Sequence, residues 1–484
     1  MSVIVKVSTH HVSSTCSSDF ISKLKLRMGC SSSSAKHQLT APEDQNVEQD
    51  VFLMVNGTSG GNASKQLLNL GTNKFEFRTK QGKYCAVWIF DLRDSSSRGK
   101  GFEQISLQAK LPGRSTNIRV VACGGDGTVK WVISELVKIK CLHLPIGVIP
   151  FGTGNDFSRA LGWGATAPSP LVGKHFKYLK ERVQMFLDSD IGVMDCWNCD
   201  ISLEDSENSH LREVKDGVIK ETHLGQKMIT HEMINYLSFG FDAQIMFEFE
   251  QQRTKSQLGN KLVMARKGLG QAIVRPPRLK TMLKELSSGD KIIKTRKKDR
   301  LLLFSNIPSY SAGANPWRRK KDDKNVNGSK KGYHPQFVGD KTLECLTVHS
   351  SVDIGLNIGT GGASKGGIRR TAQEKSYDME FVEGSTIYLQ VDGEAMKCER
   401  VSSISIRHGY HINVLRNKSS IANSLPKGYR ASMDRNIVEA VDEDFADSEG
   451  EEEIEEVDSI SDDEGETIPK EVEHRVDEPV EIEQ

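Results

Sequence analysis

Short apolar runs that each end in a glycine-rich turn recur through the first half of the chain. Such runs occupy 51–55, 118–123 and 146–150, and the turns that follow them occupy 56–61, 124–128 and 151–156. After the second turn, apolar residues return at helical spacing, beginning with Val129, Val132 and Ile133. Repeated units of strand, turn and helix predict a parallel sheet whose carboxyl edge binds a ligand.

The pattern changes past about residue 190. Shorter runs with strand-like alternation follow, for example 234–241, 301–305, 343–348 and 387–391. The sequence therefore predicts an α/β fold, with an N-terminal Rossmann-like parallel-sheet domain at 51–190 and a mostly β second domain at 191–420. The serine-rich segment 1–50 and the acidic segment 421–484 are expected to be disordered N- and C-terminal tails, because they hold too few apolar residues to pack.

The formal net charge of zero conceals two charged segments of opposite sign. The stretch 431–484 carries 23 acidic and 3 basic residues, whereas 252–332 carries 22 basic and 5 acidic residues. The basic segment favours an anionic partner, and the acidic tail is either a solvated appendage or a competitor for the same surface. We expect an anionic membrane surface and no nucleic acid, because the basic runs are not interleaved with aromatic residues.

The second glycine turn places a carboxylate where a phosphate would bind. A turn of this kind before a helix presents backbone N–H groups and the positive end of the helix dipole to an anion. Asp126 stands within Gly124-Gly-Asp-Gly-Thr128. There it would repel phosphate unless it holds Mg²⁺ or handles a proton. Taken alone, Asp126 is better explained as a helix N-cap. The related turn at 152–156, on a neighbouring strand, favours the ligand site.

Ordered motifs between residues 55 and 394 give the chain a resemblance to one family. They are Val55-Asn-Gly-Thr-Ser-Gly-Gly61, Gly124-Gly-Asp-Gly-Thr128, Pro150-Phe-Gly-Thr-Gly-Asn-Asp-Phe-Ser-Arg159, Asn235-Tyr-Leu-Ser-Phe-Gly-Phe-Asp242, Asn306-Ile-Pro-Ser309 and Val391-Asp-Gly-Glu394. This series resembles the eukaryotic-type diacylglycerol kinases, with a catalytic and an accessory domain. The resemblance implies an ATP-dependent kinase that phosphorylates the free hydroxyl of diacylglycerol to give phosphatidic acid, in lipid second-messenger signalling.

The resemblance also implies roles for individual residues, with ATP and Mg²⁺ bound between the two domains. The residues expected to line the nucleotide are Asn56, Ser59, Gly60, Gly124, Gly125, Gly127, Thr128, Thr153, Gly154, Asn155 and Arg159. The expected magnesium network consists of Asp126, Asp156 and Asp195, and Asp126 is also counted as catalytic. Asp392 matches the general base, and Glu394 lies beside it. On its local sequence alone, Asp392 would be assigned to a hairpin turn.

Two other functions stay open at this point. The first is a related lipid kinase that acts on a sphingoid base or ceramide, and the complete glycine turns favour diacylglycerol over these acceptors. The second is a weakly active adaptor that binds anionic lipid. The presence of both Asp126 and Asp392 argues against an adaptor. Phosphoryl transfer to a panel of lipids would separate the three functions.

The expected location is intracellular and cytoplasmic, with peripheral membrane association. The chain begins without an apolar signal core and has no uncharged stretch that suits a membrane span. Its nine cysteines are dispersed, which is typical of a reducing compartment. Met28-Gly29-Cys30 matches an acylation signal that would act on Gly29 and Cys30 if translation starts at Met28. A chance match explains these residues equally well.

Overall fold

The computed structural model describes residues 47–205, 209–215, 218–222, 225–251, 277–317, 333–350, 352–354 and 367–417. The described residues from Glu48 onward belong to one compact unit. The tail at 421–484, and 1–50 except for its last four residues, lie outside the described part of the chain. Segments 252–276 and 318–332 of the basic stretch also lie outside it. The first strand begins at Gln49, two residues before the predicted domain start.

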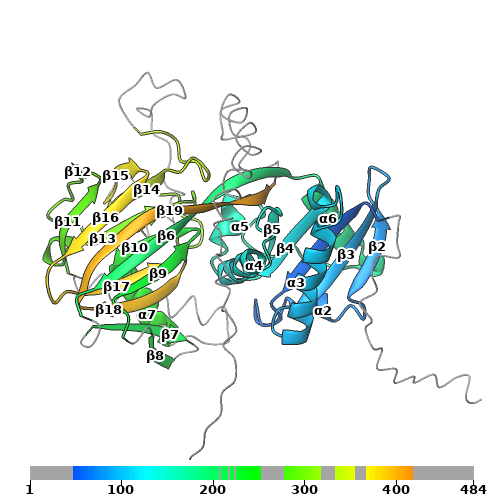
Figure 1. Cartoon of the computed structure of the whole chain (residues 1–484), viewed down its shortest axis with the longest axis horizontal. Coiled ribbons are helices and arrows are strands. Elements are labelled where there is room, and N and C mark those ends of the chain that lie inside the picture. The colour runs from blue at the N-terminus through cyan, green and yellow to red at the C-terminus, as the bar shows by residue number, and fades with distance from the viewer. Residues whose placement is uncertain are drawn as a thin grey trace, which may run out of the picture. The chain divides into compact units, whose positions relative to one another are not determined.

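The N-terminal half contains the predicted parallel sheet (Figure 1). The strand order is β5-β4-β1-β3-β2, in which β2 alone runs antiparallel to its neighbour. These strands are β1 (Gln49–Val55), β2 (Lys74–Arg78), β3 (Tyr84–Asp91), β4 (Ile118–Gly124) and β5 (Ile146–Pro150). The chain builds β2 and β3 on one side of β1 and then crosses to build β4 on the other side. Loops that follow β1 and β4 therefore meet at a topological switch point, where ligands bind in sheets of this type.

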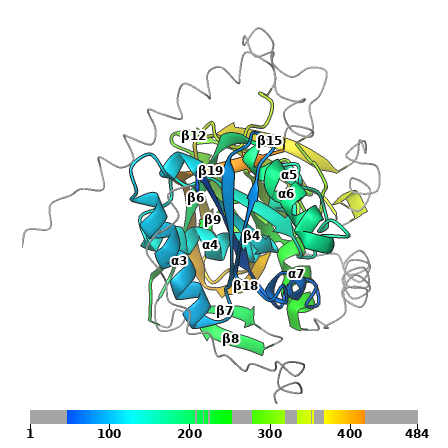
Figure 2. The ribbon, with the colours of Figure 1, turned by 90° about the vertical axis from the view of Figure 1, so that its right-hand side faces the viewer.

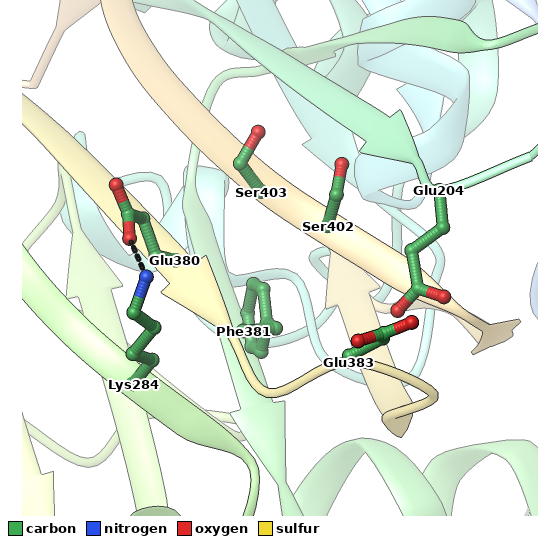
Figure 3. A pocket seen from close by; sticks show the side chains of 7 residues that line it. All are labelled: Glu204, Lys284, Glu380, Phe381, Glu383, Ser402 and Ser403. Atoms are coloured by element: carbon green, nitrogen blue, oxygen red, sulfur yellow. Dashed lines mark hydrogen bonds and ion pairs between the residues drawn. The ribbon is translucent and has the colours of Figure 1, made fainter.

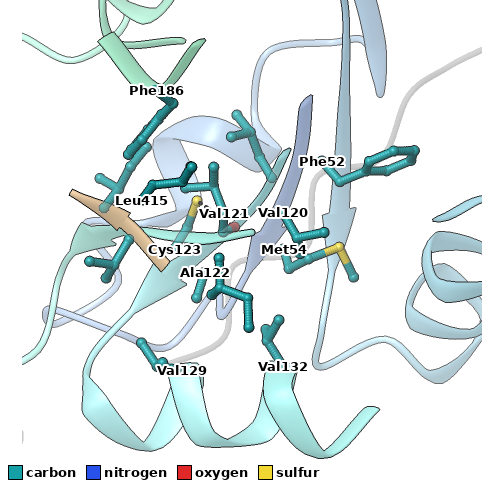
Figure 4. Close-up of a cluster of buried hydrophobic side chains, with 14 of the residues drawn as sticks. Phe52, Met54, Val120, Val121, Ala122, Cys123, Val129, Val132, Phe186 and Leu415 are labelled. Carbon is teal, nitrogen blue, oxygen red and sulfur yellow. Dashed lines mark hydrogen bonds between the residues drawn. The ribbon is translucent and has the colours of Figure 1, made fainter. Parts of the chain in front are cut away.

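Helices cover both faces of this sheet, and α3 and α6 lie on opposite faces (Figure 2). The helices are α2 (Lys65–Leu68), α3 (Ser95–Ala109), α4 (Asp126–Lys138), α5 (Asp156–Ala160) and α6 (Lys177–Leu187), with 3₁₀ turns at Ser115–Asn117 and Lys174–Phe176. The run 51–55 is fully buried because a parallel strand is enclosed on both faces. Phe52 and Met54 of β1 belong to the same core as Val129 and Val132 of α4 (Figure 4). The Rossmann-like domain is confirmed.

Two long strands tie this half to the remainder of the unit. They are β6 (Asp190–Leu203) and β19 (Val401–Arg416), which pair antiparallel along almost their whole length. The C-terminal end of β19 also pairs in parallel with β5, through Val414 and Ile146. Its neighbour Leu415 packs in the core of the N-terminal half with Phe186 (Figure 4). The C-terminal strand of the second domain predicted at 191–420 thus forms part of the first sheet. The predicted domain boundary at residue 190 did not anticipate this pairing.

The second half is mostly β, as predicted. Its antiparallel sheet has the order β15-β14-β13-β10-β17-β18-β7-β8, and it packs against the extended first sheet around Trp197, Phe239, Phe304 and Tyr377. Its strands are β7 (His210–Lys215), β8 (Val218–Thr222), β10 (Tyr236–Gly240), β13 (Leu301–Ser305), β14 (Leu343–Val348), β15 (Ile368–Glu374), β17 (Thr386–Val391) and β18 (Glu394–Glu399). The other elements are β9 (Met228–Met233), α7 (Phe241–Gln251), a 3₁₀ turn (Leu279–Thr281), β11 (Leu283–Ser288), β12 (Lys291–Ile292) and β16 (Ser376–Phe381). Within the described ranges, no helix combines the length and apolar character needed to cross a membrane.

Candidate active site

The three glycine turns come together at the carboxyl edge of the parallel sheet. The Asn56 amide donates a hydrogen bond to Thr128 Oγ1 at 3.1 Å, which joins the first turn to the second. A Cβ on Gly60 would lie 2.8 Å from the carbonyl oxygen of Phe151, so the first turn also packs on the third. Because Gly60 has φ +63°, this approach suits glycine for conformational reasons as well.

The backbones of the second and third turns approach each other closely. A Cβ on Gly152 would lie 2.6 Å from the Gly125 Cα, and one on Gly125 would lie 3.0 Å from the Gly152 Cα. In the second turn, a Cβ on Gly124 would overlap Thr128 Oγ1 at 2.2 Å. Glycine at these positions leaves the backbone N–H groups of the turns close together and unshielded by side chains, which suits a bulky anion such as a nucleotide phosphate.

Asp126 and Asp156 form a close pair of carboxylates above this edge. The Asp126 carboxylate accepts hydrogen bonds from the backbone N–H groups of Asp156 at 3.1 Å and Phe157 at 2.9 Å. It therefore caps α5 of the third turn, rather than the helix that it begins. Burial raises the pKa of Asp126 to about 6, and the charge on Asp156 adds to this rise while the two backbone hydrogen bonds oppose it.

The aspartate pair fits a hard divalent cation. A Cβ on Gly154 would lie 3.5 Å from both Asp126 Oδ2 and Asp156 Oδ2, so the two oxygens face the same point. Among the described residues, neither carboxylate has a basic side chain within ion-pair distance. The two carboxylates repel each other without a basic partner, and their donor atoms are all oxygen. Both features suit Mg²⁺.

Residues of the second half complete the surroundings of Asp156. Ser309 Oγ donates a hydrogen bond to Asp156 Oδ1 at 2.5 Å, and the Tyr236 hydroxyl and the Ala312 N–H donate to Oδ2 at 3.3 and 3.2 Å. Tyr236 also contacts Tyr310 edge to face, with ring centroids 5.0 Å apart. The loop that contains Ser309 thus holds the third-turn carboxylate in place.

Asn235 connects Asp126 to the predicted base Asp392. Its amide nitrogen lies 3.4 Å from Asp126 Oδ1, and its backbone N–H donates to Asp392 Oδ1 at 2.7 Å. The Asp392 carboxylate also accepts from the N–H groups of Ile234 and Tyr236. Asp392 itself has φ +55°, a strained backbone conformation that is frequent at functional positions. The motif that begins at Asn235 was recognisable in the sequence, but no role was predicted for Asn235 itself.

Lys130 lies between the two predicted catalytic carboxylates of the second half. Its Nζ is 3.9 Å from Asp392 Oδ2 and 4.0 Å from Glu394 Oε2. The side chain of Asp392 is only 5% exposed, whereas that of Glu394 is 67% exposed. Burial raises the pKa of Asp392, and the charge of Lys130 counteracts that rise. Sequence reasoning missed Lys130, and the one local signal is its position one helical turn after Asp126 on the same helix.

The remaining predicted nucleotide residues line the same edge. Thr153 and Gly127 are exposed there, and the Ser59 N–H donates to the Asn56 carbonyl at 3.0 Å. The Asn155 amide donates to the carbonyls of Gly152 and Ala165, both at 2.8 Å, so it fixes its own turn. Arg159 Nε donates to the Gly154 carbonyl at 3.0 Å.

Asp195, the third predicted magnesium ligand, has different partners. Its Oδ1 lies 3.0 Å from His408 Nε2 and 2.9 Å from His411 Nδ1, and its Oδ2 accepts from the Lys341 N–H at 2.8 Å. Burial would raise the pKa of Asp195, but its contacts with the two histidines lower it below the usual range. The structure gives Asp195 no hydrogen bond to Asp126 or Asp156 within the described part of the chain.

A surface pocket elsewhere does not belong to this site. It measures about 320 Å³ and lies on the second half, where Glu204, Glu380 and Glu383 contribute carboxylates beside Phe381 (Figure 3). None of its lining residues is one of the predicted site residues. We attach no chemistry to it.

Two family models match the chain in the order of its two halves. Residues 50–184 match the diacylglycerol kinase catalytic domain, and residues 232–395 match the diacylglycerol kinase accessory domain. The chain belongs to the diacylglycerol kinase family. The site described above draws on both matched regions, since the three turns lie in the first region and Asn235, Ser309 and Asp392 lie in the second.

Relatives of known name agree with this assignment. Diacylglycerol kinase iota of Rattus norvegicus is 27% identical over 73% of this chain, and the eye-specific diacylglycerol kinase of Drosophila melanogaster is 29% identical over 72%. Diacylglycerol kinase 2 of Arabidopsis thaliana is 30% identical over 65% of this chain. The matches cover 30%, 21% and 40% of these relatives' own lengths, respectively.

Proposed function

We propose that this chain transfers the γ-phosphoryl group of ATP to the free hydroxyl of diacylglycerol and so forms phosphatidic acid. The observation that carries the proposal is the bridge made by Asn235, whose side chain approaches Asp126 while its backbone N–H holds Asp392. One residue thereby connects the nucleotide turns to the buried carboxylate that we assign as the base.

The nucleotide is held by the turns, and the acceptor hydroxyl is placed by the second half. The backbone N–H groups around Gly60, Gly125 and Gly154 bind the phosphates. Asp126 and Asp156 would hold Mg²⁺, which neutralises charge on the transferring phosphoryl group. The hydrogen bonds to Asp156 from Ser309, Tyr236 and Ala312 fix the direction of its oxygens.

Asp392 is assigned as the general base. Its Oδ1 receives most of the backbone hydrogen bonds, while Oδ2 accepts from Ile234 and faces Lys130. Oδ2 therefore keeps a lone pair for the acceptor hydroxyl, whose proton it takes as the new oxygen–phosphorus bond forms and the bond to ADP breaks. A pKa raised by burial brings Asp392 nearer to the operating pH, which is what a base for an alcohol requires.

Two substitutions test these roles. Asp126→Ala and Asp392→Asn should each abolish phosphoryl transfer, with far-ultraviolet circular dichroism unchanged. Asp290→Asn, which changes an exposed aspartate in the β11–β12 turn, is the matched control and should retain full activity. Near-normal turnover in Asp126→Ala or in Asp392→Asn would overturn the corresponding assignment.

The choice of lipid is tested on the same preparation. Transfer of ³²P to diacylglycerol, sphingosine and ceramide in mixed micelles should proceed with diacylglycerol alone. Faster transfer to sphingosine or ceramide would replace the proposed substrate. If no acceptor is phosphorylated while the chain still binds anionic vesicles, the adaptor function would be favoured instead.

We further propose peripheral binding to an anionic membrane through the basic segment 252–332. In its described portion, Lys294, Lys297 and Lys298 are exposed and follow shortly in sequence after Ile292, which is 61% exposed at the edge strand β12. Cations around an exposed apolar side chain suit the headgroup region of an anionic bilayer. Replacing the three lysines by glutamine should weaken binding to phosphatidylserine vesicles. The same change at Lys65, Lys80 and Lys83, exposed lysines of the N-terminal half, should not.

Two further proposals concern segments outside the described residues. The acidic tail at 421–484 would compete with anionic lipid for the basic segment, so its deletion should strengthen vesicle binding at low salt. Unchanged binding would refute this competition. Acylation at Gly29 and Cys30 would add a membrane anchor, and intact-mass analysis of the native N-terminus decides whether it occurs.

A further inference from the structure

A cluster of two histidines and one aspartate lies on a single face of the β6–β19 pair. Asp195 of β6 is the direct cross-strand partner of His411, and His408 is the partner of Trp197, two residues further along β6. The pairing shifts register between His408 and Tyr410, so Gly409 is an extra residue in β19. Residues three apart in a regular strand point to opposite faces, and this extra residue returns both imidazoles to the face of Asp195.

The three side chains converge on one point. His408 Nε2 is 3.0 Å and His411 Nδ1 is 2.9 Å from Asp195 Oδ1, and all three ligand atoms lie within 4.8 Å of one another. Ligand atoms around a tetrahedral Zn²⁺ are about 3.3 Å apart, given bonds of about 2.0–2.2 Å. Outward shifts of a few tenths of an ångström, well within side-chain freedom, would therefore admit an ion.

The imidazole of His411 gives a second observation. Its Nδ1 is buried, and its nearest polar contact, Asp195 Oδ1 at 2.9 Å, lacks the alignment of a good hydrogen bond. A buried ring nitrogen without a partner is costly. A metal ion would occupy its lone pair and remove that cost.

We propose that Asp195, His408 and His411 form a binding site for a divalent transition-metal ion of the Zn²⁺ type. Imidazole nitrogen with carboxylate oxygen suits Zn²⁺ or Co²⁺, whereas Mg²⁺ prefers oxygen ligands alone. This separates the cluster from the Asp126–Asp156 pair, whose donors are all oxygen. The site is independent of the proposed kinase activity, and it gives Asp195 a different ion from the one that the resemblance implied.

The surroundings of the cluster suit a metal site. The segment Val338 to Lys341 covers Asp195, since the Asp195 N–H donates to the Val338 carbonyl at 2.7 Å and the Lys341 N–H donates to Asp195 Oδ2 at 2.8 Å. Such hydrogen bonds orient a ligating carboxylate.

The proposed ion would join the two strands that link the halves of the molecule. Asp195 lies near the start of β6 and His411 near the end of β19, where β19 approaches β5 of the parallel sheet. Binding would fix the register of this pair across its bulge. We expect the role of the ion to be structural, and its loss to lower the thermal stability of the unit.

The test uses the full chain, purified without a histidine tag, stripped with a chelator and dialysed. Added Zn²⁺ should be retained after gel filtration at about one ion per chain, as expected for one such site. It should also raise Tm. Added Co²⁺ should give the visible absorption of a low-coordinate site. A tenfold excess of Mg²⁺ should displace neither ion.

The variants decide whether the cluster is responsible. The double variant His408→Gln and His411→Gln should lose the retained Zn²⁺, the Co²⁺ spectrum and the Zn²⁺-dependent rise in Tm. His175→Asn is the control, because His175 is exposed with φ +53°, a conformation that asparagine tolerates. Absence of Zn²⁺ retention in the unmodified chain, retention that survives the double variant, or ready displacement by Mg²⁺ would each overturn the proposal. Circular dichroism of the stripped variants shows whether they have folded.

Discussion

Lys130→Met provides a sharp test of the catalytic assignment, because it removes one charge and keeps the aliphatic stem. Lys130 Nζ lies 3.9 Å from Asp392 Oδ2, and the lysine and aspartate side chains are 19% and 5% exposed. At that separation a charge pair interacts by about 4 kcal/mol at an effective dielectric of 20, and by about 1 kcal/mol in bulk water. An interaction of this size favours the ionised form of Asp392, so the charge of Lys130 lowers the pKa of that carboxyl.

The direction of the effect follows from the role of a base. Asp392 must be ionised to accept the proton of the hydroxyl, so activity is present above its pKa and is lost as pH falls through it. Burial already raises this pKa, and Lys130 opposes the rise. Without Lys130, the acid limb of the kcat/KM profile should move to higher pH. Activity at neutral pH should fall and recover in alkaline buffer.

The assay is a pH profile of kcat/KM for a soluble short-chain diacylglycerol. Lys138→Met is the matched control, since Lys138 lies on the same helix, is 66% exposed and contacts Glu135. Its profile should coincide with that of the unmodified chain. A Lys130→Met profile that is uniformly lower at every pH, with its acid limb unmoved, would refute the assignment of Asp392 as a base whose ionisation Lys130 supports.

Three further outcomes are expected. Ser309→Ala removes the hydroxyl that donates to Asp156 Oδ1 at 2.5 Å. A buried acceptor without its donor costs about 1–3 kcal/mol, so kcat should fall roughly 10–100-fold and the Mg²⁺ concentration needed for activity should rise. Unchanged kinetics would contradict this role of Ser309. Gly152→Ala would bring a Cβ to 2.6 Å from the Gly125 Cα and should raise KM for ATP at least roughly tenfold, whereas Gly99→Ala in α3, whose Cβ meets nothing within 4 Å, should not. Because the pKa of Asp126 is raised to about 6, its ionisation destabilises the fold as pH rises from about 4 through 6. Asp126→Asn should therefore be about 3 kcal/mol more stable than the unmodified chain at pH 7.5 in urea denaturation, with little difference at pH 4. The same difference in unfolding free energy at both pH values would disprove the argument.

The sequence was sufficient for the parallel sheet and its three turns, because strand burial and turn chemistry are local. The run 51–55 is apolar at every position, as a strand enclosed on both faces must be, and Gly60 has φ +63°, a turn conformation that favours glycine. The mostly β character of the second half was also predictable from alternation. None of this required knowledge of long-range contacts.

What could not be predicted depends on contacts between distant residues. The return of β19 to β5 is fixed by packing of Leu415 against Phe186, and no local pattern encodes that pairing. The cluster at Asp195 depends on a one-residue bulge in β19, which changes the face of a histidine without leaving a distinct sequence signal. Lys130 could be placed on the correct helix, but its approach to Asp392 requires the second half to be in position.

These long-range contacts mean that the nucleotide turns alone do not form a complete site. Asp126 and Asp156 repel one another, and within the described residues the side chains that donate hydrogen bonds to them come from Asn235, Tyr236 and Ser309 of the second half. If the parallel sheet were produced without that half, the pair would keep its repulsion and lose these donors. The accessory half is therefore best understood as a structural part of the proposed catalytic centre, since it supplies Asp392, the base that we propose, and the hydrogen-bond donors that hold the acidic turn.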